Sequence, residues 1–77
     1  MSETIRVFVN AAAVDVERGA TAVDCVRAWR EDEADAVSSG KRTITDSRGL
    51  AIAASTPAAA GSIYRTIPTR SQGERGE

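Results

Sequence analysis

The chain has 77 residues, the size of one small domain, and a formal net charge of −1 from 10 Lys and Arg against 11 Asp and Glu. This near balance argues against a protein that binds nucleic acid or an anionic membrane, because both need excess positive charge. The sequence has no histidine and a single cysteine, Cys25, which removes the usual neutral-pH base, the commonest metal ligand and any intramolecular disulfide. No signal peptide and no apolar run of about 20 residues is present. We therefore expect a cytoplasmic protein that is not an enzyme and needs no cofactor or metal.

Residues 5–17 predict a hairpin of two strands. β-Branched residues occupy every second position from residue 5, which is typical of a strand with one buried face. Asn10 and the alanines after it form the expected turn, and the alternation resumes at Val14 and Val16. Gly19 ends the second strand, since glycine adopts a positive φ without steric cost. Phe8 is expected on the opposite side of the sheet from three core residues, Ile5, Val7 and Val9.

A helix is predicted to begin at Thr21, whose hydroxyl is placed to accept a hydrogen bond from the Asp24 amide. Asp24 in turn acts as a shortened capping-box partner. The apolar residues that follow fall near one helix face, with Trp29 as the main anchor. Cys25 lies on that face and has no histidine to act as its base, so a core role is expected rather than a nucleophile.

Residues 31–39 allow two interpretations. The helix either continues to a C-cap at Gly40, or breaks near residues 31–33 and forms a short second helical turn. We favour the break. The acidic cluster of Asp32, Glu33 and Asp35 matches no calcium-loop spacing, so a solvated helix face is expected there.

Three short strands are expected next, at residues 43–45, 50–52 and 63–67. The Asp-Ser-Arg-Gly sequence at residues 46–49 has the composition of a type I turn. In the last strand, strict alternation places Arg65 on the same face as Ile63 and Ile67, which a bulge or a snorkelling arginine would resolve. No apolar side chain follows to be buried, so the expected organisation is a domain at 1–67 and a flexible tail at 68–77.

The order strand, strand, helix, strand, strand, strand is that of the ubiquitin-like β-grasp, an α+β fold. In it, a mixed sheet of four or five strands carries one main helix on one face. The chain resembles the small sulfur carriers of thiamin and molybdopterin synthesis, the ThiS/MoaD family. The likeness covers residues 4–68 and is carried by VFVN at 7–10, VDVERGATAVDCV at 14–26 and GSIYRTIP at 61–68.

The resemblance implies chemistry at the chain's end. In this family a terminal Gly-Gly is adenylated by a partner enzyme and converted to a thiocarboxylate, and glycine lets the tail thread a narrow channel. Here Pro68, Thr69 and Arg70 stand at the corresponding positions, and no diglycine occurs. The expected protein is therefore a relative without the carrier terminus. The alternative is a sulfur carrier with an atypical or processed end, partnered by an adenylating or synthase-type enzyme.

Two interpretations of the tail itself stay open. The tail is either a disordered remnant or a recognised terminus at Arg75, Gly76 and Glu77. The second interpretation rests on similarity to the Gly-Gly-Glu ending of prokaryotic ubiquitin-like modifiers, which are attached through a glutamate side chain.

The open face of the sheet is the expected protein interface. The first and last strands are neighbours in a β-grasp, so Phe8 and Tyr64, with Thr66, are predicted to form an exposed patch. Aromatic residues in such patches commonly mark interfaces. We expect Phe8, Tyr64 and Arg65 to contact a protein partner. Isolated surface aromatics without a partner are one alternative, and a homodimer through strand edges or the Phe8 face is another.

Overall fold

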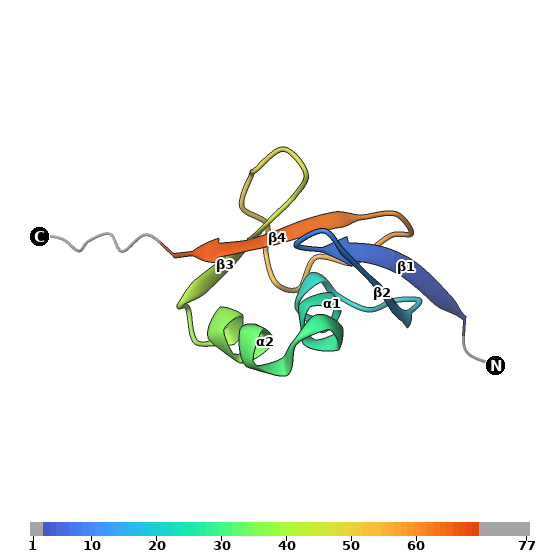
Figure 1. The fold of residues 1–77 in the computed structure, drawn as a ribbon, viewed down its shortest axis with the longest axis horizontal. Coiled ribbons are helices and arrows are strands. Elements are labelled where there is room, and N and C mark those ends of the chain that lie inside the picture. The colour runs from blue at the N-terminus through green and yellow to red at the C-terminus, as the bar shows by residue number, and fades with distance from the viewer. Residues whose placement is uncertain (1–2, 70–77) are drawn as a thin grey trace, which may run out of the picture.

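The computed structural model describes residues 3–69. Four strands form one sheet in the order β2-β1-β4-β3, and both helices lie on the same side of it (Figure 1). β1 pairs antiparallel with β2 and parallel with β4, while β3 pairs antiparallel with β4. The other face of the sheet carries no helix. In chain order the elements are β1 (Thr4–Val9), β2 (Ala12–Glu17), α1 (Ala22–Trp29), α2 (Glu31–Ser38), β3 (Arg42–Thr45) and β4 (Ile63–Pro68).

The β1–β2 hairpin is closed by the shortest possible loop. Val9 pairs with Ala12, so Asn10 and Ala11 alone make the turn. Both have positive φ, 51° and 72°, as a type I′ turn requires. The predicted alternation is confirmed, because Val7 and Val9 are fully buried whereas Phe8 between them is half-buried.

α1 begins with the capping box expected at Thr21. The Asp24 amide donates to Thr21 Oγ1 at 3.4 Å, and the Thr21 amide donates to Asp24 Oδ2 at 3.1 Å. The first two amides of α1 are also satisfied, since they donate to the carbonyls of Thr56 and Ala54 at 2.8 and 3.1 Å. The segment that leads to β4 therefore supplies acceptors that an isolated helix would lack.

The break after α1 is sharper than the sequence indicated. Arg30 alone is extended, at φ −154° and ψ 126°, and α2 follows as a complete helix rather than a short turn. Ala34 on α2 is fully buried against the core. Arg27 joins the two helices through Glu31 at 3.5 Å and Asp35 at 3.4 Å. The acidic residues in the first turn of α2 also stabilise this helix, because they lie at the positive end of its dipole.

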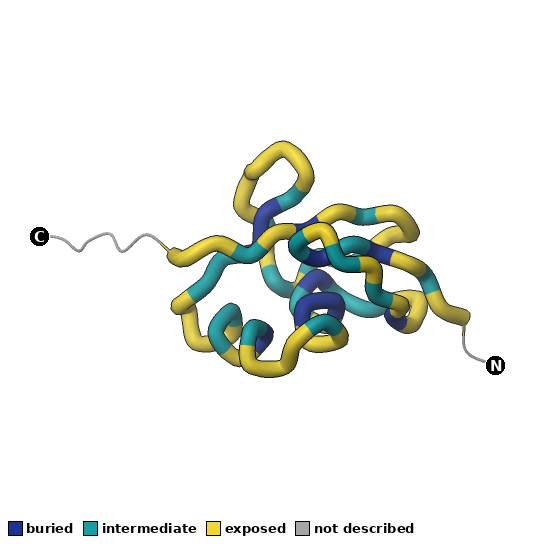
Figure 2. The backbone as a smooth tube through the Cα atoms, viewed as in Figure 1, coloured by how far each residue is buried: buried dark blue, intermediate teal, exposed yellow. Residues whose placement is uncertain are grey.

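The core lies between the sheet and the helices, and the buried positions cluster there (Figure 2). The segment at residues 50–52, expected to be a fifth strand, makes only an isolated bridge from Ala51 to Thr45, and the sheet has four strands. The turn at 46–49 forms as expected, with the Gly49 amide donating to the Asp46 carbonyl at 3.0 Å. The buried apolar residues are Val7, Val9, Val16, Ala22, Cys25, Val26, Ala34, Ile44 and Tyr64.

β4 extends past the expected end of the domain. Pro68 pairs with Arg42, and the Thr69 amide donates to the Lys41 carbonyl at 3.0 Å. Thr69 Oγ1 also lies 2.8 Å from Thr43 Oγ1. Pro68 is thus part of the sheet, and Thr69 is hydrogen-bonded beside it. These two residues stand at two of the three positions that correspond to the family's diglycine terminus. The alternative of a recognised terminus at Arg75, Gly76 and Glu77 lies outside the described residues.

Candidate functional site

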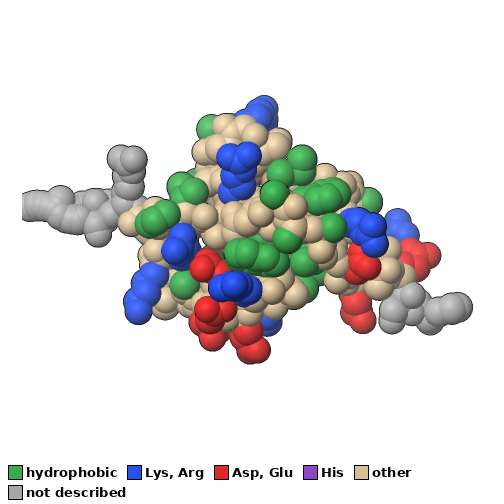
Figure 3. All heavy atoms as spheres, viewed as in Figure 1, with side chains coloured by type: hydrophobic (Ala, Val, Ile, Leu, Met, Phe, Trp, Pro, Cys, Tyr) green, Lys and Arg blue, Asp and Glu red, His purple; other side chains and the backbone are tan. Residues whose placement is uncertain are grey.

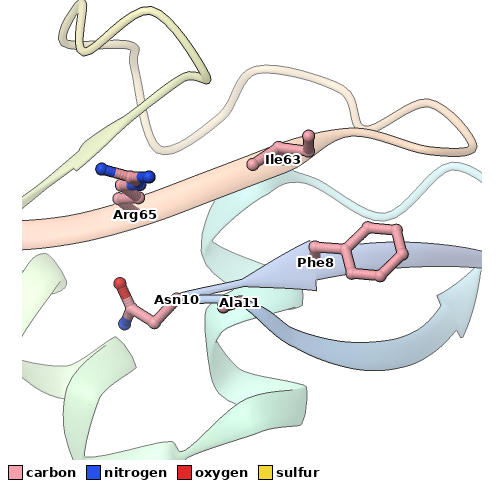
Figure 4. Close-up of a pocket in the computed structure, with 5 residues that line it drawn as sticks. All are labelled: Phe8, Asn10, Ala11, Ile63 and Arg65. Carbon is pink, nitrogen blue, oxygen red and sulfur yellow. The ribbon is translucent and has the colours of Figure 1, made fainter.

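A hollow of about 610 Å³ opens on the helix-free face, where β1 turns away from β4. We call it the β1–β4 hollow, and Figure 4 shows its side chains, with Ile63 and Arg65 standing on the same side of β4. Its lining is mostly apolar, and Arg65 is its charged group. The hollow is lined by Phe8, Asn10, Ala11, Ile63 and Arg65.

The parallel register of β1 and β4 places these residues together. Phe8 is aligned with Ile63, and the next pair is Val9 with Tyr64. Because side chains alternate between the faces of a strand, the first pair lies on the open face and the second faces the helices. The hollow begins where this short pairing ends, since the hairpin turn carries β1 away after Val9.

Tyr64 was expected in the exposed patch, and that placement is wrong. Its side chain is only 4% exposed and belongs to the core cluster. Strict alternation holds along β4, with no bulge, so Ile63, Arg65 and Ile67 share the open face. The register explains why, because Tyr64 lies beside fully buried Val9. The two isoleucines stay 45% and 44% exposed.

Arg65 lies between these exposed isoleucines. Among residues 3–69 it has no ion-pair partner, unlike the other two arginines on this side of the sheet. Arg6 pairs with Asp15 at 3.0 Å, and Arg48, in the turn that projects away from the helices, lies 3.7 Å from Asp46 (Figure 1). Arg65 therefore presents an uncompensated positive charge within an apolar surface.

The charges of the molecule are unevenly distributed. In Figure 3 acidic side chains appear over the helices and near the end where the chain begins, with basic ones among them, and basic and hydrophobic side chains show along β4 and the turn above it. The acidic cluster of α2 is partly neutralised, since Asp35 pairs with Arg27 and Glu33 lies 3.6 Å from Arg42. In the described part of the chain, no group of three or more His, Cys, Asp or Glu side chains is arranged to hold a metal ion.

Asn10, which lines the hollow, is hydrogen-bonded to Thr66 on β4. Its Oδ1 accepts a hydrogen bond from the Thr66 amide at 3.1 Å, and its Nδ2 donates to Thr66 Oγ1 at 2.9 Å. The Thr66 hydroxyl donates onward to Glu33 Oε1 on α2 at 3.3 Å. Thr66 is therefore directed toward the helices and does not belong to the exposed patch, contrary to the sequence prediction.

Cys25 is fully buried in α1, and this burial, with help from Asp24, raises the pKa of its thiol to about 11. The thiolate is the reactive form of cysteine, so the buried thiol lacks both access and charge. The expected core role is confirmed. No helix among the described residues is long and apolar enough to cross a membrane.

No protein-family model matches the chain, and no curated protein matches it. In structure it is similar to SAMP1 from Haloferax volcanii, with a TM-score of 0.55 and 18% sequence identity. The match covers 92% of this chain and 100% of that chain. The fold is a ubiquitin-like β-grasp. The likeness confirms the expected fold class and, at the level of the fold, the resemblance to ThiS/MoaD-like β-grasp proteins.

Within this β-grasp, sequence reasoning found Phe8 and Arg65 but missed Asn10, Ala11 and Ile63. The missed residues lie where a turn and a parallel pairing meet, which no local pattern reveals. One signal was available, because a β-grasp pairs its first and last strands in parallel. Aligning Val9 with Tyr64 by their shared inward position would have placed Ile63 beside Phe8.

Proposed function

We propose that this protein is a small, non-catalytic ubiquitin-like module that binds a protein partner through the open face of its sheet. Phe8, Ile63 and Arg65 make the central contacts, with Ile67 at the margin. The observation that supports this most is the β1–β4 hollow itself. It combines the exposed Ile63, a half-buried phenylalanine and an arginine without an ion-pair partner among residues 3–69, on a face that no helix covers. Exposed Ile67 lies on the same face of β4, outside the hollow.

Physical arguments favour an interface there. Exposed apolar surface next to a hollow gains free energy when a partner excludes water from it, and each large side chain contributes about 1.5–3 kcal/mol on full burial. Arginine and aromatic residues are also enriched where interfaces are energetically strongest. The contact residues stand on paired strands rather than on a loop.

The test begins with site-specific photo-crosslinking. A benzoylphenylalanine at position 8 is compared with the same group at Ala28, an exposed position on α1. We expect a specific adduct from position 8 and none from position 28. The captured protein is then purified and titrated against the native chain and variants.

Ile63→Ala should weaken this binding by about tenfold, the equivalent of 1.4 kcal/mol. Leu50→Ala is the matched control, because Leu50 is 56% exposed but lies outside the hollow. Equal binding by the native chain and the Ile63→Ala and Phe8→Ala variants would overturn the proposal.

A further inference from the structure

The open face carries a positive charge that no carboxylate among residues 3–69 balances. Of the two arginines that β1 and β4 place on this face, Arg6 is paired with Asp15 at 3.0 Å, whereas Arg65 has no carboxylate partner among residues 3–69. A guanidinium flanked by apolar side chains binds a carboxylate more strongly than one in open water, because its neighbours exclude solvent. The surface around Arg65 is therefore complementary to a negative group next to an apolar one.

The edge of β4 that faces the hollow offers no free amide donor to an added strand. Beyond Tyr64 the amides on this edge belong to alternate residues, Thr66 and Pro68. The Thr66 amide already donates to Asn10 Oδ1 at 3.1 Å. Pro68 has no amide hydrogen. An occupant of the hollow consequently finds no free amide donor on this edge, so we expect its side chains to make most of its contacts.

A second copy of the chain fits this face poorly. In a two-fold symmetric dimer the same patch lies on both subunits, so a dimer centred on the hollow brings Arg65 against the partner's Arg65. Two acidic side chains of β2 share this face, Asp15 and Glu17. Asp15 is already engaged by Arg6, and Glu17 pairs with Thr4 at the end of the hairpin away from the hollow. Like charges near the axis oppose such a dimer.

We propose that the partner presents an acidic segment in which a large apolar side chain stands next to Asp or Glu. The apolar side chain enters the hollow between Phe8 and Ile63, and the carboxylate pairs with the Arg65 guanidinium. This inference rests on the proposed docking function and specifies the chemistry of the partner.

The experiment uses the full chain, labelled with ¹⁵N, and three sets of short synthetic peptides. The first set places Leu, Ile or Phe between Asp and Glu. The second replaces the acids with Asn and Gln, and the third with Lys and Arg. Binding is followed through the amide signals of Phe8, Ile63 and Arg65. We expect the acidic set to shift these signals and to bind at least about tenfold more tightly than the neutral set.

Charge-reversal variants make the assignment specific. Arg65→Glu should abolish binding of the acidic set and create binding of the basic set. Lys41→Glu is the matched control, because it makes the same charge change at an exposed residue outside the hollow. Its affinity for the acidic set should stay within about twofold of the native value, since exposed charges at a distance are screened.

The possible outcomes separate the partner's chemistry from the docking function. Equal or tighter binding of the neutral or basic set at the hollow overturns the acidic partner while leaving the docking site intact. An absence of shifts with all three sets overturns this inference, and the crosslink at position 8 then decides independently whether docking fails too. A dimer in sedimentation that Arg65→Glu strengthens would identify the occupant as a second copy and would likewise overturn it.

Discussion

The side chain of Asn10 accepts the hydrogen bond from the Thr66 amide that a neighbouring strand would otherwise accept. β1 ends at Val9, yet the Thr66 amide still has an acceptor, because Asn10 Oδ1 lies 3.1 Å away. The same side chain donates to Thr66 Oγ1 at 2.9 Å. Asn10 also has a φ of 51°, which asparagine tolerates better than most residues. One residue thus both forms the hairpin turn and holds the second half of β4.

Replacing Asn10 with glycine separates these two roles. Glycine keeps the positive φ but removes both side-chain hydrogen bonds, so we expect Asn10→Gly to lower the free energy of unfolding by about 1–3 kcal/mol. Hydrogen exchange should accelerate at the Thr66 amide more than at Tyr64. Unchanged exchange at Thr66 would show that the Asn10 bond does not hold β4.

Ala11 is a strained position that offers a stabilising substitution. Its φ of 72° is unfavourable for any residue with a Cβ. Ala11→Gly should therefore raise the free energy of unfolding by roughly 0.5–1 kcal/mol, measured by urea titration. Ala13→Gly is the control, because the same change inside β2 should lower stability by a similar amount. Destabilisation by both changes would argue against the turn conformation.

Truncation should lower the stability much more at Tyr64 than at Phe8. Tyr64 is buried in the core, so Tyr64→Ala should cost about 3–5 kcal/mol of stability. Phe8 lies on the open face, and Phe8→Ala should cost about 1 kcal/mol or less while weakening partner binding. Chemical denaturation of both variants checks the assignment of faces. Similar losses of stability would mean that Phe8 is also a core residue.

The buried thiol of Cys25 should make the protein sensitive to alkali. Burial raises its pKa from an ordinary 9.0 to about 11, so the folded state holds the proton more tightly than the unfolded chain. The resulting stability is complete below pH 9 and is lost as the pH rises toward 11. Urea titrations across this range should show a steeper decline for the native chain than for Cys25→Ala. Parallel declines would contradict this role for the thiol.

Asp46 should act in the opposite direction, at acid pH. Its carboxylate accepts hydrogen bonds from the amides of Leu50 at 3.0 Å and Arg48 at 2.9 Å. These bonds, with the charge of Arg48, hold its pKa below the ordinary 3.8, so the turn is stabilised above that value and loosens as the pH falls further. An NMR titration should show the Leu50 and Arg48 amide signals moving together with the Asp46 carboxyl. Asp46→Asn should remove this coupled titration.

The elements that the sequence predicted correctly depend on short-range chemistry. The alternation in β1 and the capping box at Thr21 involve residues within a few positions of one another, so they are visible in a single chain. The turn at Asp46 is of the same kind. None of these features depends on how distant segments are aligned.

The incorrect predictions concern residues whose burial or strand pairing depends on how segments distant in sequence are aligned in the sheet. Tyr64 was placed outside because aromatic residues often mark interfaces, while Ile63 and Ile67 were expected to need burial. The parallel register with β1 buries Tyr64 and leaves the two isoleucines exposed, since it aligns Tyr64 with Val9 on the side of the helices. The fifth strand failed for a similar reason, because residues 50–52 meet β3 only through the single Ala51 bridge.

The alternation along β4 divides one strand between two tasks. Tyr64 lies in the core and Thr66 points toward α2, while Ile63, Arg65 and Ile67 face outward. The outward side chains can consequently change in size and charge with little loss of stability of the fold. Three substitutions on a single strand would be enough to redirect such a module from one partner to another.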